Sequence, residues 1–298
     1  MAILEISNVR KTYNNKAALK GISLSINKGE FIALLGPNGA GKSTLISILG
    51  NTVVRDSGQI IACGYDINKD TKKFKASLGI VPQEVNFDPF FTPLEILLFQ
   101  QGLYGLKPDK AFVIDLLDKM ALTPQNSAYI RSLSGGMKRR LLVAKAIVHK
   151  PSILILDEPT AGVDVELRQH LWKFLKDLNQ QGVTIILTTH YIEEAQNLCD
   201  KIAIINKGEL ITYENKNTLL DKIGIKTLEV SLDKPITDKL KQVGLDYKIL
   251  AENKVLITYK DSAEIGKIIQ ALNNNDFVLT NLKIHESNLE DVFLTLTK

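Results

Sequence analysis

A run of small residues that ends in Gly-Lys-Ser, from Gly36 to Ser43, has the residue types that bind a polyphosphate. Its glycines let backbone N–H groups turn inward around phosphate oxygens without clashes from Cβ atoms. Lys42 supplies a positive charge for the β- and γ-phosphates, and the Ser43 hydroxyl suits a Mg²⁺ ion. The spacing therefore predicts a loop that binds a nucleoside triphosphate. The residues expected to contact it are Gly36, Pro37, Asn38, Gly39, Ala40, Gly41, Lys42, Ser43 and Thr44.

Two acidic residues, Asp157 and Glu158, follow the apolar stretch Ile153–Leu156. The stretch is typical of a buried strand, and α/β sheets place their sites at the carboxyl ends of strands. Asp157 is expected to hold Mg²⁺ through water, and Glu158 to polarise an attacking water. The alternative is that both carboxylates only cap the next helix. The phosphate loop favours the catalytic interpretation.

A third motif, Leu133–Met137, reads Leu-Ser-Gly-Gly-Met and precedes a helix with Lys138, Arg139 and Arg140 in its first turn. Ser134 is a good N-cap, and the two glycines free backbone N–H groups for an anion. Basic residues in a first turn oppose the helix dipole, so we expect them beside a phosphate or an acidic partner. The alternative is a capped helix start with a solvated basic face.

In this order and spacing, the three motifs resemble those of the ABC (ATP-binding cassette) ATPases, over about residues 1–220. The resemblance implies ATP as substrate and Mg²⁺ as cofactor. The implied metal ligands are Ser43, Gln83 and Asp157, and the implied catalytic residues are Glu158, His190, Lys42 and Gln83. Gln83 would also link the site to a transporter, and His190 would contact the γ-phosphate. The alternative for His190 is a histidine that caps a helix, yet it ends the apolar strand Ile185–Thr189, as in the family.

Other residues take their expected roles from the resemblance alone. Tyr13 falls where the family places an aromatic ring that stacks on adenine, although a lone tyrosine is more often a surface residue. The third motif is similar to the family signature, in which Ser134, Gly135 and Gly136 close over the ATP of another subunit. Asp164 belongs to a loop that joins the two subunits.

Two positions depart from the usual family pattern. Met137 stands where glutamine is commonest, and Val163 stands where leucine is usual. Neither change removes a phosphate-binding backbone group or a catalytic side chain, so ATP hydrolysis is expected. The Met-Lys-Arg-Arg run is similar to that of a branch of exporter-like subunits for drugs and antibiotics.

The elements that position these motifs follow from the apolar pattern. The continuously apolar runs Ile153–Leu156 and Thr184–Leu187 indicate strands covered on both faces, with an amphipathic helix, Val165–Gln181, between them. Strand, helix, strand indicates an α/β fold, here a P-loop NTPase core of the ABC type. Further strands are expected at Leu4–Val9, Ile22–Ile26, Phe31–Leu35, Gln59–Ala62, Leu78–Val81, Lys201–Ile205 and Glu209–Tyr213.

The predicted domains are 1–222, the ATPase, and 226–298, a small accessory domain. Helical patterns alone fill about residues 87–150, which predicts a helical insertion subdomain. The C-terminal order is strand, helix, two strands, helix, strand and a closing helix. This βαββαβ order resembles a ferredoxin-like α+β domain. Its first helix is expected at Ile236–Val243.

The composition is that of a globular protein, with 298 residues, 45% hydrophobic and 23% charged. The net charge of +4 is too small to indicate nucleic-acid binding. No apolar run approaches the roughly 20 residues of a membrane span, and no signal segment is recognised. Cys63 and Cys199 have no metal or redox spacing. We therefore expect a cytoplasmic protein, peripheral on the cytoplasmic face of the membrane.

One copy of each motif means one cassette per chain, so a second copy, or a homologous cassette, should complete the ATP sites. The resemblance implies the motor subunit of a membrane transporter, most readily an exporter, that drives a separate polytopic permease. The alternatives are a soluble ABC ATPase that acts on ribosomes or DNA, and an importer subunit. The insertion would dock on the permease, with Phe87–Phe91 either exposed for docking or packed inside the insertion.

Overall fold

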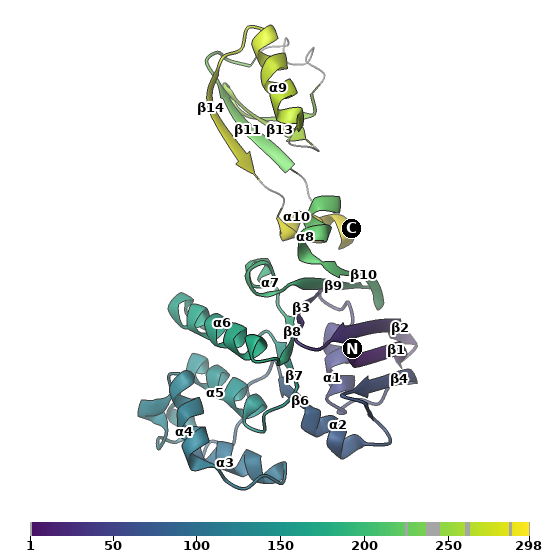
Figure 1. The fold of residues 1–298 in the computed structure, drawn as a ribbon, viewed down its shortest axis with the longest axis vertical. Helices are drawn as coiled ribbons and strands as arrows, with labels where there is room; N and C mark the ends of the chain where they lie inside the picture. The colour runs from purple at the N-terminus through teal and green to yellow at the C-terminus, as the bar shows by residue number, and fades with distance from the viewer. Residues whose placement is uncertain (1, 224–225, 237–244, 260–262, 286–287, 298) are drawn as a thin grey trace. The chain divides into compact units, whose positions relative to one another are not determined.

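The computed structural model describes residues 2–223, 226–236, 245–259, 263–285 and 288–297 (Figure 1). The chain forms two compact units, Met1–Lys216 and Asn217–Lys298. The division expected from the sequence, between 222 and 226, lies further along the chain, after helix α8 (Lys216–Ile223). No helix among the described residues has both the length and the apolar character needed to cross a bilayer.

A six-stranded sheet organises the first unit, with strand order β10-β9-β3-β8-β7-β6. Neighbouring strands run parallel from β9 to β6, and only the edge strand β10 is antiparallel. Every residue of β3, β7 and β8 is buried, as continuously apolar strands require. The strands are β3 (Phe31–Leu35), β6 (Leu78–Val81), β7 (Ile153–Asp157), β8 (Thr184–Thr188), β9 (Lys201–Asn206) and β10 (Glu209–Asn215).

A second, antiparallel sheet has the order β2-β1-β4-β5. Its strands are β1 (Ala2–Tyr13), β2 (Lys16–Asn27), β4 (Ser57–Ala62) and β5 (Tyr65–Asp66). Asn14 and Asn15 join β1 to β2 with positive φ angles of 44° and 65°, which a tight hairpin turn requires of its two central residues. The hairpin is longer than the predicted strands Leu4–Val9 and Ile22–Ile26.

Helix α1 (Lys42–Leu49) packs in the core between the two sheets, where Leu45 and Leu49 join apolar residues from both. Three more helices belong to this part of the unit: α2 (Thr71–Ser77), α6 (Val165–Gln180) and α7 (Ile192–Leu198). The helix α6 confirms the amphipathic prediction. The short α2 was not predicted.

The helical insertion is confirmed. Every residue from 82 to 152 is described, and none of them lies in a strand. The insertion contains α3 (Pro93–Leu103), α4 (Lys110–Lys119) and α5 (Gly135–Ile147), with single 3₁₀ turns at Thr123–Gln125 and Ile130–Ser132. Figure 1 shows the three helices gathered at one end of the first unit. Within the predicted docking segment, Phe90 is exposed and Phe91 is partly buried.

The second unit contains an antiparallel sheet with the order β12-β13-β11-β14. This is the strand order 2-3-1-4 that a ferredoxin-like βαββαβ domain requires. The helix predicted at Ile236–Val243 lies, apart from Ile236, outside the described residues, so the full pattern stays a prediction. The elements are β11 (Lys226–Leu232), β12 (Tyr247–Ala251), β13 (Lys254–Tyr259), α9 (Ala263–Asn274), β14 (Leu279–His285) and α10 (Leu289–Thr297).

Candidate active site

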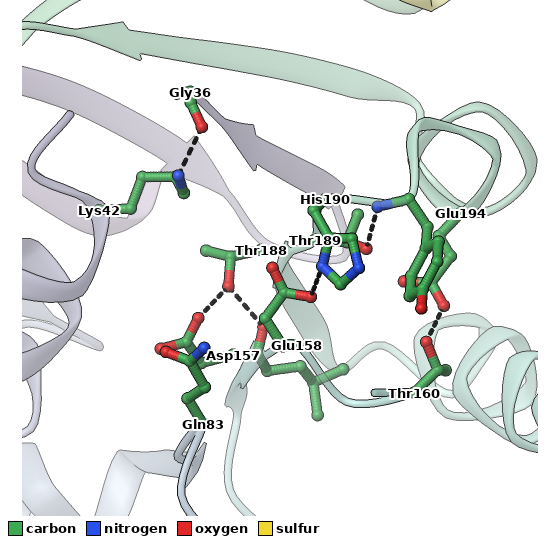
Figure 2. Close-up of polar contacts among 12 residues, drawn as sticks. Gly36, Lys42, Gln83, Asp157, Glu158, Thr160, Thr188, Thr189, His190 and Glu194 are labelled. Atoms are coloured by element: carbon green, nitrogen blue, oxygen red, sulfur yellow. Dashed lines mark hydrogen bonds and ion pairs between the residues drawn. The ribbon is translucent and has the colours of Figure 1, made fainter. Parts of the chain in front are cut away.

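The carboxyl ends of four parallel strands bring most of the predicted site together. The phosphate loop follows β3, Gln83 follows β6, Asp157 ends β7, and His190 follows β8. Because neighbouring parallel strands end at the same edge of a sheet, their following residues meet there. Figure 2 shows the side chains of Lys42, Gln83, Asp157, Glu158 and His190 gathered at this edge.

The phosphate loop keeps its shape because two of its glycines leave no room for a side chain. A Cβ atom on Gly36 would lie 2.2 Å from the carbonyl oxygen of Ile205. On Gly41 it would lie 2.6 Å from the carbonyl oxygen of Ala18, and Gly41 also has a φ angle of 113°. Gly41 is the N-cap of α1 and has no side chain to accept from the first N–H groups of the helix. Those groups are therefore available to an anion.

Lys42 bends back over the loop. Its Nζ donates to the carbonyl oxygens of Gly36, at 2.5 Å, and Pro37, at 3.2 Å. Partial burial lowers the pKa of Lys42, while the negative charges of Glu158 and Asp157 act to raise it. The ammonium is thus held beside the loop and close to both acids. Its positive charge would stabilise a phosphate bound there.

The three residues predicted to ligate Mg²⁺ line one cavity. Ser43, Gln83 and Asp157 are all part of the wall of a cleft of about 650 Å³. The Asp157 carboxylate is buried, and the Thr188 hydroxyl donates to its Oδ1. Figure 2 shows the Gln83 side chain pointing toward it. Hydroxyl, amide and carboxylate oxygens are ligands that suit Mg²⁺, so the residues present fit this ion.

Glu158 is held in an unusual conformation that aims its carboxylate at His190. Its φ angle is 54°, in the left-handed region, and its backbone N–H donates to the carbonyl oxygen of Thr188 at 3.0 Å. Its Oε2 lies 2.5 Å from His190 Nδ1. A non-glycine residue with positive φ costs about 1–3 kcal/mol and often marks a functional site. Glu158 and His190 therefore form a pair of a carboxylate and an imidazole.

A buried carboxylate lies behind this pair. Glu194 is 1% exposed and accepts hydrogen bonds from Thr160 Oγ1 and, at 3.3 Å, from Trp172 Nε1. Two acidic residues, Glu193 and Glu194, lie in the first turn of α7. Glu193 is exposed, whereas Glu194 connects α7 to the segment after Glu158 and to α6. Thr160 and Trp172 carried no motif and were not found from the sequence.

The remaining predicted residues are exposed residues or helix caps. Ser134 caps α5 by accepting from the N–H of Met137 at 3.2 Å, and both Ser134 and Gly135 are exposed. Asp164 caps α6 in the same way through the N–H of Leu167, at 3.0 Å. Tyr13 is 43% exposed at the end of the β1–β2 hairpin. Within the described part of the chain, these side chains form no hydrogen bond with Lys42, Asp157 or Glu158.

The structure shows that two arginines in the basic turn of α5 point inward. Arg139 is 2% exposed and Arg140 is 3% exposed, so neither forms a solvated face or an outward phosphate site. The Arg139 guanidinium donates to four carbonyl oxygens at the ends of β6 and β7. Arg140 Nη1 donates to the carbonyl oxygens of Met120 and Ala121. Backbone carbonyls inside the protein accept from Nη atoms of both guanidinium groups, whereas the Nε atom of each is buried without a hydrogen-bond partner. Sequence alone could not show this.

Comparison with known proteins assigns these features to a family. Residues 19–161 match the family described as "ABC transporter". The chain is 39% identical to the linearmycin resistance ATP-binding protein LnrL of Bacillus subtilis (strain 168), over 99% of this chain and 98% of that protein. It is 34% identical to the Nod factor export ATP-binding protein I of Rhizobium etli, over 100% of this chain and 94% of the relative.

Solved structures show the same fold. An ATP-binding subunit of an ABC transporter superposes with a TM-score of 0.69 at 25% identity, over 73% of this chain and 91% of that one. A dimeric ATP-binding cassette in a post-hydrolysis state, bound to ADP and Pi, superposes with a TM-score of 0.66 at 28% identity. That match covers 71% of this chain and 98% of the other.

Proposed function

Because the chain belongs to the family of ABC transporter ATP-binding proteins, we propose that it is the motor subunit of a membrane exporter. It binds ATP and hydrolyses it with Mg²⁺, as this family does. The observation that supports hydrolysis is the 2.5 Å contact between Glu158 and His190, on the sheet edge that also presents Lys42 and Asp157. The observation that supports export is the match to two export or resistance proteins over nearly the whole chain.

Each residue at this edge has a separate task in hydrolysis. Glu158 orients the attacking water and accepts its proton, because its carboxylate is fixed by His190 Nδ1. Lys42 and the N–H groups at the start of α1 bind the phosphates and stabilise the charge that develops on them. His190 offers its second ring nitrogen to the γ-phosphate. Ser43, Gln83 and Asp157 would hold Mg²⁺, which would supply further charge neutralisation.

A second copy of the chain completes each ATP site. Ser134 and Gly135 are exposed, so the N-terminus of α5 is available to an ATP bound by another copy. Asp164 lies in the loop proposed to join the two copies, and Tyr13 stacks on adenine. The dimeric cassette among the similar structures supports this arrangement.

Export is supported by the relatives that match over nearly the whole chain. One is named for resistance to linearmycin and the other for Nod factor export, and both are ATP-binding proteins. The motor would act on the cytoplasmic face of the membrane, through a separate polytopic permease that selects the cargo. The two alternatives, a soluble ATPase acting on ribosomes or DNA and an importer subunit, have no such support.

Purification of the Glu158→Gln variant with ATP from membranes of its own cell tests the proposal. The variant should retain ATP, hydrolyse it at a rate at least about 10²-fold lower, and co-purify with a polytopic membrane protein in near-equal amount. Full turnover would contradict the role of Glu158. Recovery from the soluble fraction with ribosomes or nucleic acid would favour the soluble alternative.

A further inference from the structure

Arg139 makes the most extensive set of side-chain hydrogen bonds near the active site, although no step of the hydrolysis described above uses it. Its Nη1 donates to the carbonyl oxygens of Pro82 and Gln83, each at 2.8 Å. Its Nη2 donates to the carbonyl oxygen of Asp157 at 2.6 Å and to that of Glu158. Three of these four carbonyls therefore belong to residues of the candidate site.

The guanidinium lies where two neighbouring strands separate. The parallel pairing of β6 with β7 ends at Val81 and Leu156. Beyond that pair the two backbones have no ladder bond in the described sheet, and Arg139 bridges them instead. A planar guanidinium presents its N–H donors in a fixed fork, so it can hold two backbones at a set separation.

Arg139 also connects this point to the signature motif. It lies in the first turns of α5, whose N-cap is Ser134. Burial lowers the pKa of Arg139, while the negative charges of Asp157 and Glu158 act to raise it. The negative charges of both acids therefore stabilise the guanidinium in a site from which water is largely excluded. Arg139 also supplies a hydrogen-bond donor to the carbonyl of Glu158, whose backbone is left-handed.

We propose that Arg139 is a positioning residue that fixes Gln83 and Glu158 relative to the signature helix α5. The role rests on the function proposed above, because it acts only through the Mg²⁺ ligand and the catalytic carboxylate. If α5 shifted when a second copy binds, the Arg139 guanidinium would move the backbone of both Gln83 and Glu158. The hydrogen bonds of Arg139 go to backbone carbonyls and not to the phosphate loop, so its effect should fall on turnover rather than on ATP affinity.

Steady-state hydrolysis by the full chain, with Arg139→Lys and Arg139→Gln, tests this role. Lysine keeps the charge but cannot reach four carbonyls with a fixed fork, and glutamine also loses the charge. Both variants should lower kcat by about tenfold or more, because misplacement of a catalytic group by about 1 Å costs up to 10²-fold. The KM for ATP should stay within about threefold of that of the original chain, since the phosphate loop is untouched. Half-maximal activity should require more Mg²⁺, since Gln83 is displaced.

Arg140→Lys is the matched control. Arg140 is the next residue on the same helix and equally buried, yet it donates only to carbonyls of the insertion. Arg140→Lys should lower the melting temperature about as much as Arg139→Lys does. Its kcat per ATP-binding molecule should stay within about threefold of that of the original chain. An equal loss of kcat in Arg140→Lys would overturn the inference, because the effect would then belong to α5 as a whole.

Glu158→Gln, assayed in parallel, separates the two claims. If Glu158→Gln turns over like the original chain, the proposed function fails, whatever Arg139 does. If Glu158→Gln is inactive but both Arg139 variants keep their kcat and their Mg²⁺ dependence, only the positioning role is wrong. An Arg139→Lys chain that is unfolded and binds no ATP also overturns it, since Arg139 would then serve folding alone.

Discussion

The imidazole of His190 holds the Glu158 carboxylate at 2.5 Å, so its removal should affect catalysis more than binding. His190→Ala is expected to lower kcat by about 10²-fold, the range typical of a lost acid–base partner. The KM for ATP should change little, because Lys42 and the glycines of the loop remain. Hydrolysis assays over a range of ATP concentrations check this. His170→Ala, at an exposed position of α6, is the control and should be silent.

At Gly36 even one methyl group should disturb the phosphate loop. The Cβ of Gly36→Ala would lie 2.2 Å from the carbonyl oxygen of Ile205, so the backbone must move. Overpacking of this kind costs about 1–3 kcal/mol, which corresponds to a loss of roughly 5- to 150-fold in ATP affinity when the cost falls on the bound state. Titration with a fluorescent ATP analogue measures the affinity. Gly102→Ala, where nothing lies within 4 Å of the added Cβ, should bind normally.

Residue types and spacing predicted Lys42, Asp157 and Glu158, because these residues lie in motifs that are contiguous in the sequence. Gln83 and His190 were assigned only through the family resemblance. The structure places Lys42, Gln83, Asp157, Glu158 and His190 at one edge. Their chemical roles stay predictions. Arg139 could not be found this way, since the side of α5 that faces β6 and β7 depends on tertiary packing. Its inward direction is a property of the fold, not of the basic run.

Among the elements, four strands are joined through Glu30, just before β3. Its carboxylate accepts from Lys201 Nζ at 2.6 Å, Tyr213 Oη at 2.8 Å and the backbone and side chain of Asn27. Burial alone would raise the pKa of Glu30, but the hydrogen bonds from Lys201, Asn27 and Tyr213 lower it from 4.5 to about 2. A depressed carboxylate pKa contributes stability above the unfolded value and loses it as the pH falls toward the folded value.

Glu30→Gln should therefore destabilise the chain at neutral pH, and the difference should shrink in acid. Urea titration measures the free energy of unfolding of both chains near neutral pH and again at about pH 3. The difference between the original chain and the variant should be smaller at pH 3. A gap of constant size would mean that the ion pair with Lys201 contributes nothing that depends on pH. Glu209→Gln tests an exposed ion pair, with Lys20, and should change stability by less than about 1 kcal/mol.

The contact between α6 and α7 has a built-in reporter, because Trp172 is the only tryptophan of the chain. Its Nε1 donates to Glu194, as does the Thr160 hydroxyl. Glu194→Ala leaves two hydrogen-bond donors without their acceptor. It should lower the free energy of unfolding by about 1–3 kcal/mol for each donor that stays buried. The expected result is a lower melting temperature together with a shift of the Trp172 emission. Unchanged emission would show that this contact does not form in solution.

Buried strands and long amphipathic helices were predictable, because burial on both faces or on one face leaves a clear apolar pattern. The outer half of the β1–β2 hairpin was not. There the run Arg10–Tyr13 is largely polar, and the strand is held by pairing rather than by its own apolar face. The helix α2 is short, with Phe74 and Ser77 as its buried residues, so it shows too few turns for a period to be read.

At the scale of the whole molecule, the proposed dimer makes each ATP site from two chains. Lys42→Ala removes the phosphate-binding charge from a chain but leaves its signature intact. Gly135→Asp does the reverse, by placing a carboxylate where the γ-phosphate of the other chain would bind. The Cβ of Gly135 would meet nothing within 4 Å, and an acid in a first turn suits the helix dipole, so this variant should fold.

Mixing the two inactive variants then distinguishes ATP sites formed by two chains from ATP sites formed within one chain. In a mixed dimer, the intact phosphate loop of the Gly135→Asp chain faces the intact signature of the Lys42→Ala chain, which restores one site of two. Random pairing makes half of the dimers mixed, so the mixture should recover about a quarter of the normal rate, because an isologous dimer has two equivalent sites. If each chain used its own signature, mixing would restore nothing. Recovery that grows with total protein concentration would further show that dimer formation, not a contaminant, supplies the activity.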